Sequence, residues 1–473
     1  MKESKEGITV KKEENMPEWY EQAVQKAELA DFAPISGFMV IKPRGYAIWE
    51  NIQNYFNKRI KFYGVKNTYF PLLIPESYFK REAEHAKGFE PELAWVQKDE
   101  GERLAIRPTS ETIIHDFFSK WIRSYRDLPL RINQWCNILR WEVKQTKLFL
   151  RSREFLWQEG HCAYETEEEC EKEVLLILEE YRKLAEEILA IPVLVGEKTE
   201  KERFAGAKRT YTIEALMPDG KALQLGTSHN LGQGFSKVFN VKFLGKDEKE
   251  HLVWLSSWGF STRLIGAIVM AHGDNKGLVL PPAVSPLQIT IIPILTKKDK
   301  EKVLKKCQEI KEALEKNFTV EIDSREDYSP GWKFNEQELY GTPLRIELGP
   351  KDLEKDQVVL VRRDLNTKKI IKTYQLKKEV EALLDTIQKS LYVNAKRFLD
   401  SSIVEVKAWE EFLKTVKDKK ITLASFCGEV ECEDYIKSET DGATSRCIKE
   451  VTSGKCIKCN NKAKYKVYFS KSY

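Results

Sequence analysis

Apolar residues recur at helical spacing in the segment from residue 43 to residue 64. On a helix, one face of this segment collects five apolar or aromatic side chains: Ile48, Ile52, Tyr55, Phe56 and Ile60. Pro43 stands near the start of the segment and Gly64 just past its end, which is the usual placement of these two residues at helix termini. The pattern predicts an amphipathic helix.

A second helical pattern covers residues 166–189. Thr166 is followed three residues later by Glu169, and this spacing predicts a capping box at the N-terminus of the helix. The helical period continues through Val174, Leu178, Tyr181, Leu184 and Ile188.

Strand patterns surround these two helices. Residues 68–75, with the sequence TYFPLLIP, predict a strand. Because proline has no N–H to donate to a sheet, Pro71 indicates an edge or interface position for this strand. Helices and strands need not alternate over residues 1–285, so we expect an α+β domain there with a largely antiparallel sheet.

The chain changes character at a group of three prolines in residues 281–286. From residue 287 to about residue 375, strand and helix patterns alternate, which predicts a small α/β domain. Residues 377–399 predict a helix that leads to a cysteine-bearing tail. The domains that we expect are residues 1–285, 286–395 and 396–473.

Composition and charge narrow the class of protein. Of 473 residues, 42% are hydrophobic, which is enough for several cores and argues against a disordered chain. The net charge of +5 permits a nucleic-acid partner held by local patches but does not require one. Residues 1 to about 35 read as a charged, partly ordered lead-in, and no apolar run approaches the ~18 residues of a membrane span. We expect a soluble, cytoplasmic protein with no membrane partner.

Residues 139–161 mix arginine, glutamate, tryptophan and histidine. We interpret the segment as two strands joined by a loop near residues 145–150. Alternation then places Arg140, Glu142 and Lys144 on one face of the first strand. On the second strand a shared face would carry Arg151, Arg153, Phe155, Trp157, Glu159 and His161. Such a face is typical of a pocket for a charged or polar ligand. The alternative is a solvated hairpin with cross-strand ion pairs, each contributing only ~0.2–1 kcal/mol.

Five of the nine cysteines fall within residues 427–459. The pairs Cys427/Cys432 and Cys456/Cys459 have the spacing of a tetrahedral four-sulfur zinc site. Cys447 lies between the two pairs and is a fifth candidate, although a buried, unliganded cysteine suits it best. Disulfides are the weaker alternative in a reducing compartment.

Several segments together resemble the class II aminoacyl-tRNA synthetases, and in detail the prolyl-tRNA synthetase family of the archaeal and eukaryote-like type. Residues 139–161 resemble motif 2 of that class. Residues 37–53 together with residues 67–75 resemble motif 1, and residues 256–282 resemble motif 3. RPTSET at residues 107–112 and QLGTSHNLGQGFSK at residues 224–237 resemble the family's proline- and nucleotide-site segments. The resemblance extends from about residue 19 to residue 473.

The resemblance implies an α+β catalytic domain with an antiparallel sheet, an α/β anticodon-binding domain and a small α+β zinc-binding C-terminal domain. It implies a homodimer that joins L-proline to tRNA(Pro), with ATP and Mg²⁺ in the catalytic domain. The zinc would be structural, held by Cys427, Cys432, Cys456 and Cys459. The family's bacterial-type members carry an editing insertion between motifs 2 and 3. The segment between His161 and Trp258 is too short for that insertion, so we expect no clearance of mischarged alanine in cis.

The resemblance also implies individual roles. Arg140 and Arg263 would be the catalytic cations, contacting the α-phosphate with the proline carboxylate and the γ-phosphate respectively. The implied ATP-binding residues are Arg140, Glu142, Arg151, Ser152, Gln224, Thr227, Ser261 and Arg263. The implied proline-binding residues are Thr109, Glu111, Arg140, Trp157, Glu159, His161, Phe204 and His229. The purely structural alternatives are helix capping by a surface arginine for Arg263, and helix capping by Thr109 and Ser110. For Thr109 and Ser110 we expect helix capping in addition to ligand binding.

In the expected α/β domain the resemblance implies anticodon contacts by Lys333, Glu338, Arg345 and Lys351, with Arg362 nearby. The alternative is an ordinary solvated face. The sequence departs from the family pattern at Leu225, at Asn230, at Ser261 and in the loop of residues 144–149. Two other functions compete: activation of another class IIa amino acid, and a non-enzymatic RNA-binding role. A non-enzymatic relative should have lost Arg140 or Arg263, and this chain keeps both.

Overall fold

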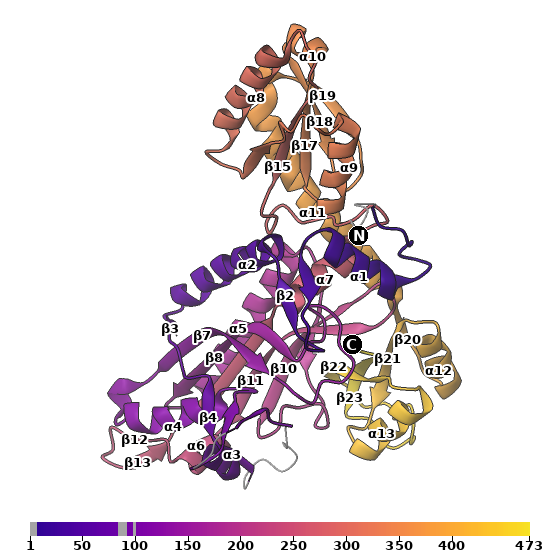
Figure 1. The fold of residues 1–473 in the computed structure, drawn as a ribbon. Coiled ribbons are helices and arrows are strands. Elements are labelled where there is room, and N and C mark those ends of the chain that lie inside the picture. Colours follow the sequence, from indigo (N-terminus) through magenta and orange to yellow (C-terminus); the bar gives the residue numbers. More distant parts are fainter. Residues whose placement is uncertain (1–6, 84–91, 98–100) are drawn as a thin grey trace.

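The computed structural model describes residues 7–83, 92–97 and 101–473. Residues 1–6 of the expected lead-in therefore lie outside the described residues. The largest sheet has eleven strands in the order β20-β21-β23-β22-β9-β10-β11-β14-β8-β7-β3, and a separate sheet has five strands in the order β16-β15-β17-β18-β19. Figure 1 shows the five-stranded sheet and its helices at the top of the molecule, above the large sheet.

The middle of the large sheet consists of six neighbouring antiparallel strands. They are β7 (Leu130–Leu139), β8 (Glu154–Tyr164), β9 (Leu194–Glu197), β10 (Arg209–Leu216), β11 (Ala222–Gly232) and β14 (Trp254–Ser261). The short β3 (Lys66–Asn67) adds to β7 in parallel. This part of the molecule confirms the expected α+β class with an antiparallel sheet.

One hydrophobic core contains side chains of the sheet and of helices that include α2 (Pro43–Phe62), α5 (Glu167–Lys183) and α7 (Arg263–His272). The expected apolar face of α2 is buried, except for Tyr55, which is only partly buried. At the start of α5, the Thr166 hydroxyl accepts from the Glu169 N–H at 3.2 Å, and the Glu169 carboxylate accepts from the Thr166 N–H at 3.3 Å. Both predicted helices and the capping box are confirmed, and α5 continues into a π-helix, Leu184–Ile188.

One expectation about the first hundred residues is wrong. Residues 68–75 do not form one strand: the chain leaves the large sheet after β3 and enters a three-stranded sheet at β4 (Leu73–Pro75), which pairs with β6 (Leu104–Ile106). Pro71 lies between the two strands, where its missing N–H costs no sheet bond. Within the expected partly ordered lead-in, α1 (Met16–Lys26) buries four side chains in the core. These are Trp19, Tyr20, Ala23 and Val24.

Smaller elements complete the lower half of the molecule. The helices are α3 (Glu76–Ala83), α4 (Glu111–Trp121) and α6 (Gly234–Phe239). The strands are β1 (Ala30–Phe32), β2 (Met39–Ile41), β5 (Trp95–Val96), β12 (Lys242–Leu244) and β13 (Glu250–Leu252). Among the described residues, no helix has the length and apolar composition needed to cross a membrane.

The five-stranded sheet forms the expected α/β domain. Its strands are β15 (Ile289–Pro293), β16 (Val320–Ile322), β17 (Leu344–Leu348), β18 (Gln357–Arg362) and β19 (Lys368–Lys372). Its helices are α8 (Lys300–Leu314), α9 (Pro330–Tyr340) and α10 (Pro350–Glu354). The long α11 (Leu376–Ser402) packs on the core of this domain and then leads back to the large sheet.

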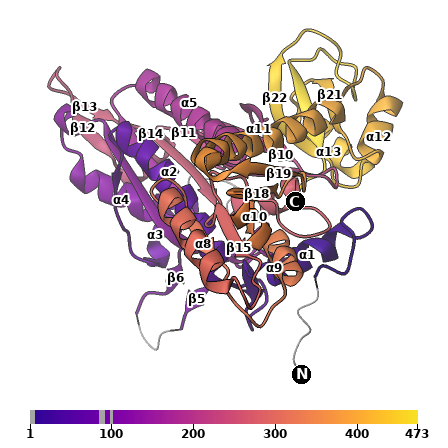
Figure 2. The ribbon, with the colours of Figure 1, turned by 90° about the horizontal axis from the view of Figure 1, so that it is seen from above.

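The C-terminal tail forms its own core, yet its strands belong to the large sheet. Its elements are β20 (Ile403–Glu405), α12 (Trp409–Lys417), β21 (Ile421–Phe426), α13 (Val430–Glu439), β22 (Thr444–Val451) and β23 (Tyr465–Ser470). Strand β22 pairs with β9 through Ile448 and Glu197. Beside this pair, a Cβ on Gly196 would lie 2.2 Å from the Ile448 carbonyl oxygen, so only glycine allows the two strands to approach. Figure 2 shows the C-terminal elements beside the end of the large sheet.

Candidate active site

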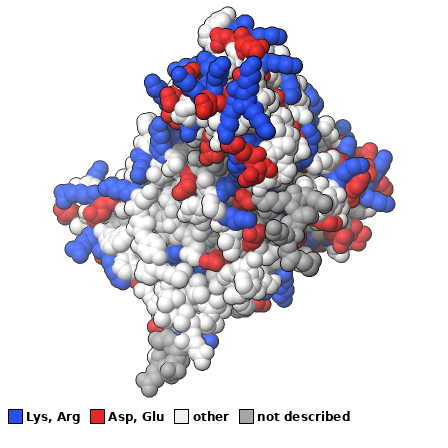
Figure 3. Space-filling model, turned by 45° about the horizontal axis from the view of Figure 1, so that its top comes forward, with Lys and Arg blue, Asp and Glu red and all other residues white. Residues whose placement is uncertain are grey.

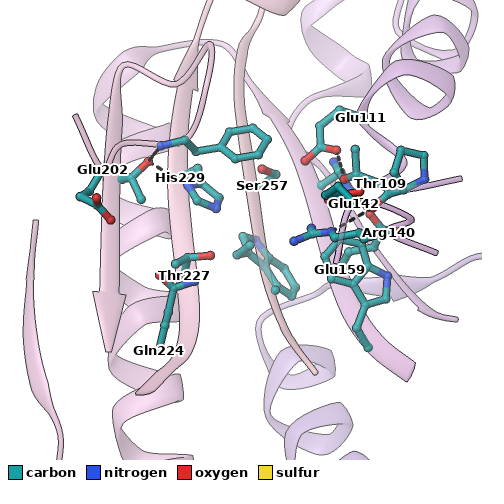
Figure 4. A pocket seen from close by; sticks show the side chains of 17 residues that line it. Thr109, Glu111, Arg140, Glu142, Glu159, Glu202, Gln224, Thr227, His229 and Ser257 are labelled. Carbon is teal, nitrogen blue, oxygen red and sulfur yellow. Dashed lines mark hydrogen bonds and ion pairs between the residues drawn. The ribbon is translucent and has the colours of Figure 1, made fainter. Parts of the chain in front are cut away.

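A pocket of about 290 Å³ lies over the middle strands of the large sheet. Strands β8, β11 and β14 supply its floor, and the segments before α4, after β7 and between β9 and β10 supply its walls. The lining residues are Pro108, Thr109, Glu111, Arg140, Glu142, Trp157, Glu159, His161, Glu202, Phe204, Thr210, Gln224, Thr227, His229, Ser257, Trp258 and Gly259. Figure 4 shows Glu111, Arg140 and Glu159 facing Glu202 and His229 across this space.

Residue alternation predicts the pocket-facing side chains of the second strand from Trp157 onward. It does not predict those of the first strand. Trp157, Glu159 and His161 lie on β8 and line the pocket as predicted. The first strand, however, ends at Leu139, so the predicted shared strand face of Arg140, Glu142 and Lys144 is wrong. Arg140 and Glu142 reach the pocket from the loop after β7, where no two-residue period applies.

The start of the second strand also differs from the prediction, because β8 begins only at Glu154. Arg153 lies before the strand and turns away: its guanidinium donates to the Val143 carbonyl at 3.0 Å and lies 4.6 Å from the centre of the Trp141 ring. Arg151 is exposed, and neither Arg151 nor Arg153 lines the pocket. The predicted pocket face is therefore correct only from Trp157 onward.

A buried hydrogen-bond network holds Glu159 in place. Its carboxylate accepts from the Ser110 hydroxyl and from the Gln134 amide, each at 2.6 Å, and lies 3.0 Å from Nε2 of His161. Burial favours the neutral carboxyl and the neutral imidazole. The hydrogen bond between the two side chains and their opposite charges have a larger effect than burial. The pKa of Glu159 is therefore lowered and the pKa of His161 is raised. The two side chains therefore form a buried ion pair on the pocket floor.

The expected capping role of Thr109 and Ser110 is wrong. Ser110 occupies the N-cap position of α4, but its hydroxyl makes no capping hydrogen bond and binds Glu159 instead. The Thr109 hydroxyl donates to the carboxylate of Glu111. Both hydroxyls therefore orient carboxylates at the pocket, and the Ser110 hydroxyl does not cap α4.

Phe204 and His229 form an opposite wall. Their ring centroids are 4.7 Å apart, and the Thr210 hydroxyl lies 3.0 Å from both the Phe204 N–H nitrogen and Nδ1 of His229. Burial, together with repulsion from His161, lowers the pKa of His229 to about 3, so this imidazole is neutral at ordinary pH. Glu202 and Thr210 also line the pocket, and the sequence did not predict either of them. Neither belongs to a motif or to a periodic pattern that could have indicated it.

Arg263 is the first residue of α7, as predicted, and its side chain turns inward rather than capping a surface helix. It donates to the Leu150 carbonyl and to the Gln224 carbonyl, each at 3.1 Å. Burial, and then repulsion from Arg140, lowers the pKa of Arg263 to about 10. Gln224 and Thr227 line the pocket, whereas Arg263, Ser152 and Ser261 lie outside its lining. The Ser261 hydroxyl accepts from the Arg263 N–H at 3.2 Å.

Arg140 and Arg263 share an electrostatic property that matters for function. Arg140 is partly buried, and desolvation lowers its pKa against the opposing attraction of Glu142, Glu111 and Glu159. Its only side-chain hydrogen bond among the described residues runs to the Pro108 carbonyl at 3.5 Å, and its guanidinium lies 5.8 Å from the centre of the Trp157 ring. Among the described residues, neither guanidinium donates to a carboxylate, and their hydrogen bonds run to backbone carbonyls. A partly buried cation without a direct carboxylate contact can gain one from a bound anion such as a phosphate or carboxylate.

Two departures from the family pattern serve the fold. Leu225 is buried in the core beneath the sheet, on the side away from the pocket. Asn230 is buried, and its amide donates to Glu171 at 2.7 Å. Neither residue lines the pocket, so neither change removes a pocket contact.

The four predicted cysteine ligands form a second site. The sulfur atoms of Cys427, Cys432, Cys456 and Cys459 all lie within 4.8 Å of one another. Four thiolates at about 2.3 Å from one zinc ion require sulfur–sulfur separations of about 3.8 Å, so the donor set fits zinc. Cys447 lies apart on β22, buried in a separate hydrophobic cluster with Leu194. The buried-cysteine interpretation of Cys447 is confirmed.

The predicted anticodon residues are mostly internal. Lys333 is 2% exposed and donates to the Asp323 carbonyl at 2.8 Å. Arg345 is buried and pairs with Glu347 at 2.9 Å and with Glu338 at 3.6 Å. The alternative of a solvated face is therefore wrong for these two cations. Lys351, on α10, is exposed.

Comparison with known proteins identifies the family. Residues 94–272 match the model of the class II tRNA synthetase core domain (G, H, P, S and T), and residues 288–384 match the anticodon binding domain. Residues 409–473 match the C-terminal domain of prolyl-tRNA synthetase. The proline–tRNA ligase of Alkaliphilus oremlandii is 51% identical over 469 residues, covering 98% of this chain and 97% of that protein. The chain belongs to the proline–tRNA ligase family.

Other relatives support the same assignment. The proline–tRNA ligase of Natranaerobius thermophilus is 49% identical over 97% of both chains, and proline–tRNA ligase 2 of Bacillus cereus is 49% identical over the full length of both. All three expected domain types of this family are present, with the expected fold classes. The resemblance drawn from the motifs is confirmed.

Proposed function

We propose that this chain is a proline–tRNA ligase. It activates L-proline with ATP to form prolyl-adenylate, releases pyrophosphate, and transfers the prolyl group to the 3′ end of tRNA(Pro). Beyond family membership, the observation that carries the proposal is a pair of inward-turned arginines, Arg140 in the pocket lining and Arg263 beside it, whose guanidinium groups donate only to backbone carbonyls among the described residues. Activation joins two anions, and such a site both attracts and aligns them.

At the ATP end, Arg140 contacts the α-phosphate and the proline carboxylate, and Arg263 contacts the γ-phosphate. Glu142, Gln224 and Thr227 line the pocket and hold the nucleotide. Arg151, Ser152 and Ser261 complete the ATP-binding set from outside the pocket lining. The buried Ser152 hydroxyl has no hydrogen-bond partner among the described residues, which leaves it free to bind a ligand. Mg²⁺, when bound with ATP, neutralises phosphate charge.

At the proline end, a secondary ammonium on an apolar ring needs carboxylate oxygens and a close apolar wall. Glu111, oriented by Thr109, and the Glu159–His161 pair provide the polar contacts. Trp157 and Phe204 provide the wall, together with the neutral His229 beside Phe204. The pocket therefore offers a charged end and an apolar side to the same small amino acid.

We place the domain boundaries at residues 1–285, 286–395 and 396–473, and the tRNA anticodon on the second domain. Figure 3 shows charged side chains crowded over this upper domain, while much of the surface below carries neither acidic nor basic groups. Lys351 is accessible to RNA in this conformation. Lys333, Glu338 and Arg345 can contact a base only by exchanging an internal partner for it.

A homodimer is supported by exposed aromatic side chains around the segments that resemble motif 1. Phe62 is 77% exposed and Tyr69 is 69% exposed, and Val40 lies exposed on β2. Exposed apolar groups of this size gather at protein interfaces. Light scattering should give the mass of a dimer, and F62E together with Y69E should give a monomer. A monomeric wild-type protein would contradict this part of the proposal.

Zinc bound by Cys427, Cys432, Cys456 and Cys459 would have a structural role, because four protein thiolates leave no coordination position for chemistry. We expect C432S to lower the zinc content and the Tm while affecting proline activation less. Elemental analysis and thermal unfolding measure these effects, and C447S is the matched control because its thiol lies outside the cluster. Full zinc retention in C432S would remove Cys432 from the ligand set.

The decisive experiment is exchange of radiolabelled pyrophosphate into ATP, tested with each of the twenty amino acids. Exchange with proline alone is the expected result. Exchange with a different amino acid would assign the chain to another class IIa specificity, and no exchange would favour an RNA-binding protein without activity. Because the partner tRNA is charged where translation occurs, we place the protein in the cytoplasm. We also expect the purified protein to leave alanyl-tRNA intact.

A further inference from the structure

The loop between β9 and β10, residues 198–208, forms one wall of the pocket and is held from two sides. Its second half is fixed by the catalytic domain: the Phe204 N–H donates to the Thr210 hydroxyl at 3.0 Å, and the Lys208 N–H donates to the Asn230 carbonyl at 2.8 Å. Its first half, residues 198–202, makes its side-chain contacts largely with the C-terminal domain. The loop that carries Glu202 and Phe204 to the pocket thus bridges two domains.

Three successive contacts join the first half of the loop to α13 and β22. The buried Thr199 hydroxyl donates to the Glu433 carboxylate at 2.9 Å and lies 2.8 Å from the Ser445 hydroxyl. Lys201 pairs with Asp434. The Glu202 carboxylate accepts from the Arg446 guanidinium at 3.2 Å. Glu202 therefore faces the pocket while a residue of another domain holds its carboxylate.

Arg446 is built into this position rather than placed on a surface. Its side chain is 6% exposed, and it also donates to the Thr444 hydroxyl at 2.6 Å and to the Ser445 carbonyl at 2.9 Å. A third contact runs to Glu214 at 3.9 Å, and Glu214 is paired with Lys198, the first residue of the loop, at 2.6 Å. Arg446 is thus oriented by its own strand and connected to the loop at both residue 198 and residue 202.

We propose that Arg446 is a positioning residue for proline binding: from the C-terminal domain it holds the β9–β10 loop in the conformation that closes the proline pocket. The inference rests on the proposed function for its substrate. It requires no contact between Arg446 and the substrate, because Glu202 and Phe204 transmit its effect. A loop that is ordered before proline arrives binds more tightly than one that must be ordered by proline.

The test compares R446M, which removes the guanidinium but keeps the length of the side chain, with R446K and with K466M. Lys466 pairs with Glu405 at 2.7 Å within the same domain and makes no ion pair to the loop, so K466M is the matched control. In proline-dependent pyrophosphate exchange, R446M should raise the KM for proline roughly 5-fold or more, the scale of typical coupling between sites. The kcat and the KM for ATP should stay within about 2-fold by the same argument. R446K should recover part of the loss, and K466M should match the wild type.

A readout independent of activity is amide hydrogen–deuterium exchange in residues 198–208. Exchange in this loop should be faster in R446M than in K466M, because fewer contacts oppose local opening. An unchanged KM for proline in folded R446M would overturn the proposal. So would equal losses in kcat and in both KM values, which would indicate a global defect.

If R446M does not fold, T199V tests the same proposal from the loop side. This change removes the hydroxyl contacts to Glu433 and Ser445 and leaves the pocket lining intact. It should also raise the KM for proline, and an unchanged KM would overturn the proposal. Failure of the proposed function looks different: the wild type itself would show no exchange with proline, while hydrogen exchange in the loop would still respond to R446M if the positioning role is correct.

Discussion

The active-site pocket and the junction between the catalytic and C-terminal domains are both buried and both charged, yet their charges are arranged differently. At the junction, Lys198 and Arg446 each pair with Glu214. Beside the pocket, Arg140 and Arg263 have only carbonyl oxygens as hydrogen-bond partners among the described residues. The comparison teaches that burial of charge alone does not indicate a ligand site. An inward-turned cation whose side chain donates only to carbonyl oxygens does.

The largest effect is expected at the junction. E214Q would leave Lys198 and Arg446 buried without their shared carboxylate, and we expect it to lower the free energy of unfolding by about 3–5 kcal/mol. Urea titration measures the change. E450Q is the control, because Glu450 is half exposed and lies 3.6 Å from Lys466, an exposed pair of the kind that contributes about 0–1 kcal/mol. Equal effects of the two changes would remove the distinction between the paired junction and an ordinary surface pair.

At the pocket, we expect a substitution of Arg140 to change the free energy of unfolding less than E214Q does, but to lower the rate of pyrophosphate exchange strongly. R140A should reduce proline-dependent pyrophosphate exchange by at least ~10²-fold, the scale for one lost preorganised donor. The free energy of unfolding should fall little, because the change removes a partly buried side chain whose one hydrogen bond among the described residues is the 3.5 Å contact to the Pro108 carbonyl. R140K is the control: it keeps the charge but loses the planar fork, and it should retain only part of the activity. Near-normal exchange in R140A would contradict the role of Arg140.

The smallest effect is expected for the pair of Glu159 and His161 in the pocket. Like the pairs at the junction, it is buried and joins opposite charges. The pKa of His161 is raised above its ordinary 6.5, so its stabilising charge is fully present below pH 6.5 and is lost as the pH rises through the raised value. The pKa of Glu159 is lowered below its ordinary 4.5, so its contribution is present above pH 4.5 and is lost as the pH falls through the lowered value. The pair therefore stabilises most between pH 4.5 and 6.5.

H161N should accordingly reduce the free energy of unfolding more at about pH 5.5 than at about pH 8.5. Urea titrations of both proteins at the two pH values measure this difference. A constant difference between the proteins would show that His161 contributes by packing and not by charge. H251N is the control, because His251 pairs with Asp247 at an exposed position.

The outcome at residues 139–161 shows where sequence reasoning stops. Alternation found Glu159 and His161 because they lie on a real strand. It failed for Arg140 because β7 ends at Leu139, and no proline or glycine marks that end. Arg140 reaches the pocket because the loop after the strand folds back, and loop paths depend on contacts distant in sequence. The motif resemblance identified Arg140 where periodicity could not.

Glu202 was out of reach for a different reason. Its place depends on Arg446, more than two hundred residues later in the chain. The continuous sheet raises the same difficulty: nothing local in residues 194–197 or 444–451 predicts that β9 pairs with β22. The cysteine cluster could be predicted because the chemistry of zinc dictates the spacing of its ligands. The fold classes could be predicted because helical and strand periods are local.

The pairing of β9 with β22 has a consequence for how the protein is made. A ribosome synthesises β9 long before β22, so during translation the catalytic sheet ends in an open edge, with unpaired N–H and C=O groups that can attach to another chain. The same strand leads into the wall of the candidate active-site pocket. A nascent or prematurely terminated chain therefore has an incomplete binding site beside an unpaired strand edge that is prone to aggregation. Both are completed only when the last strands have been synthesised.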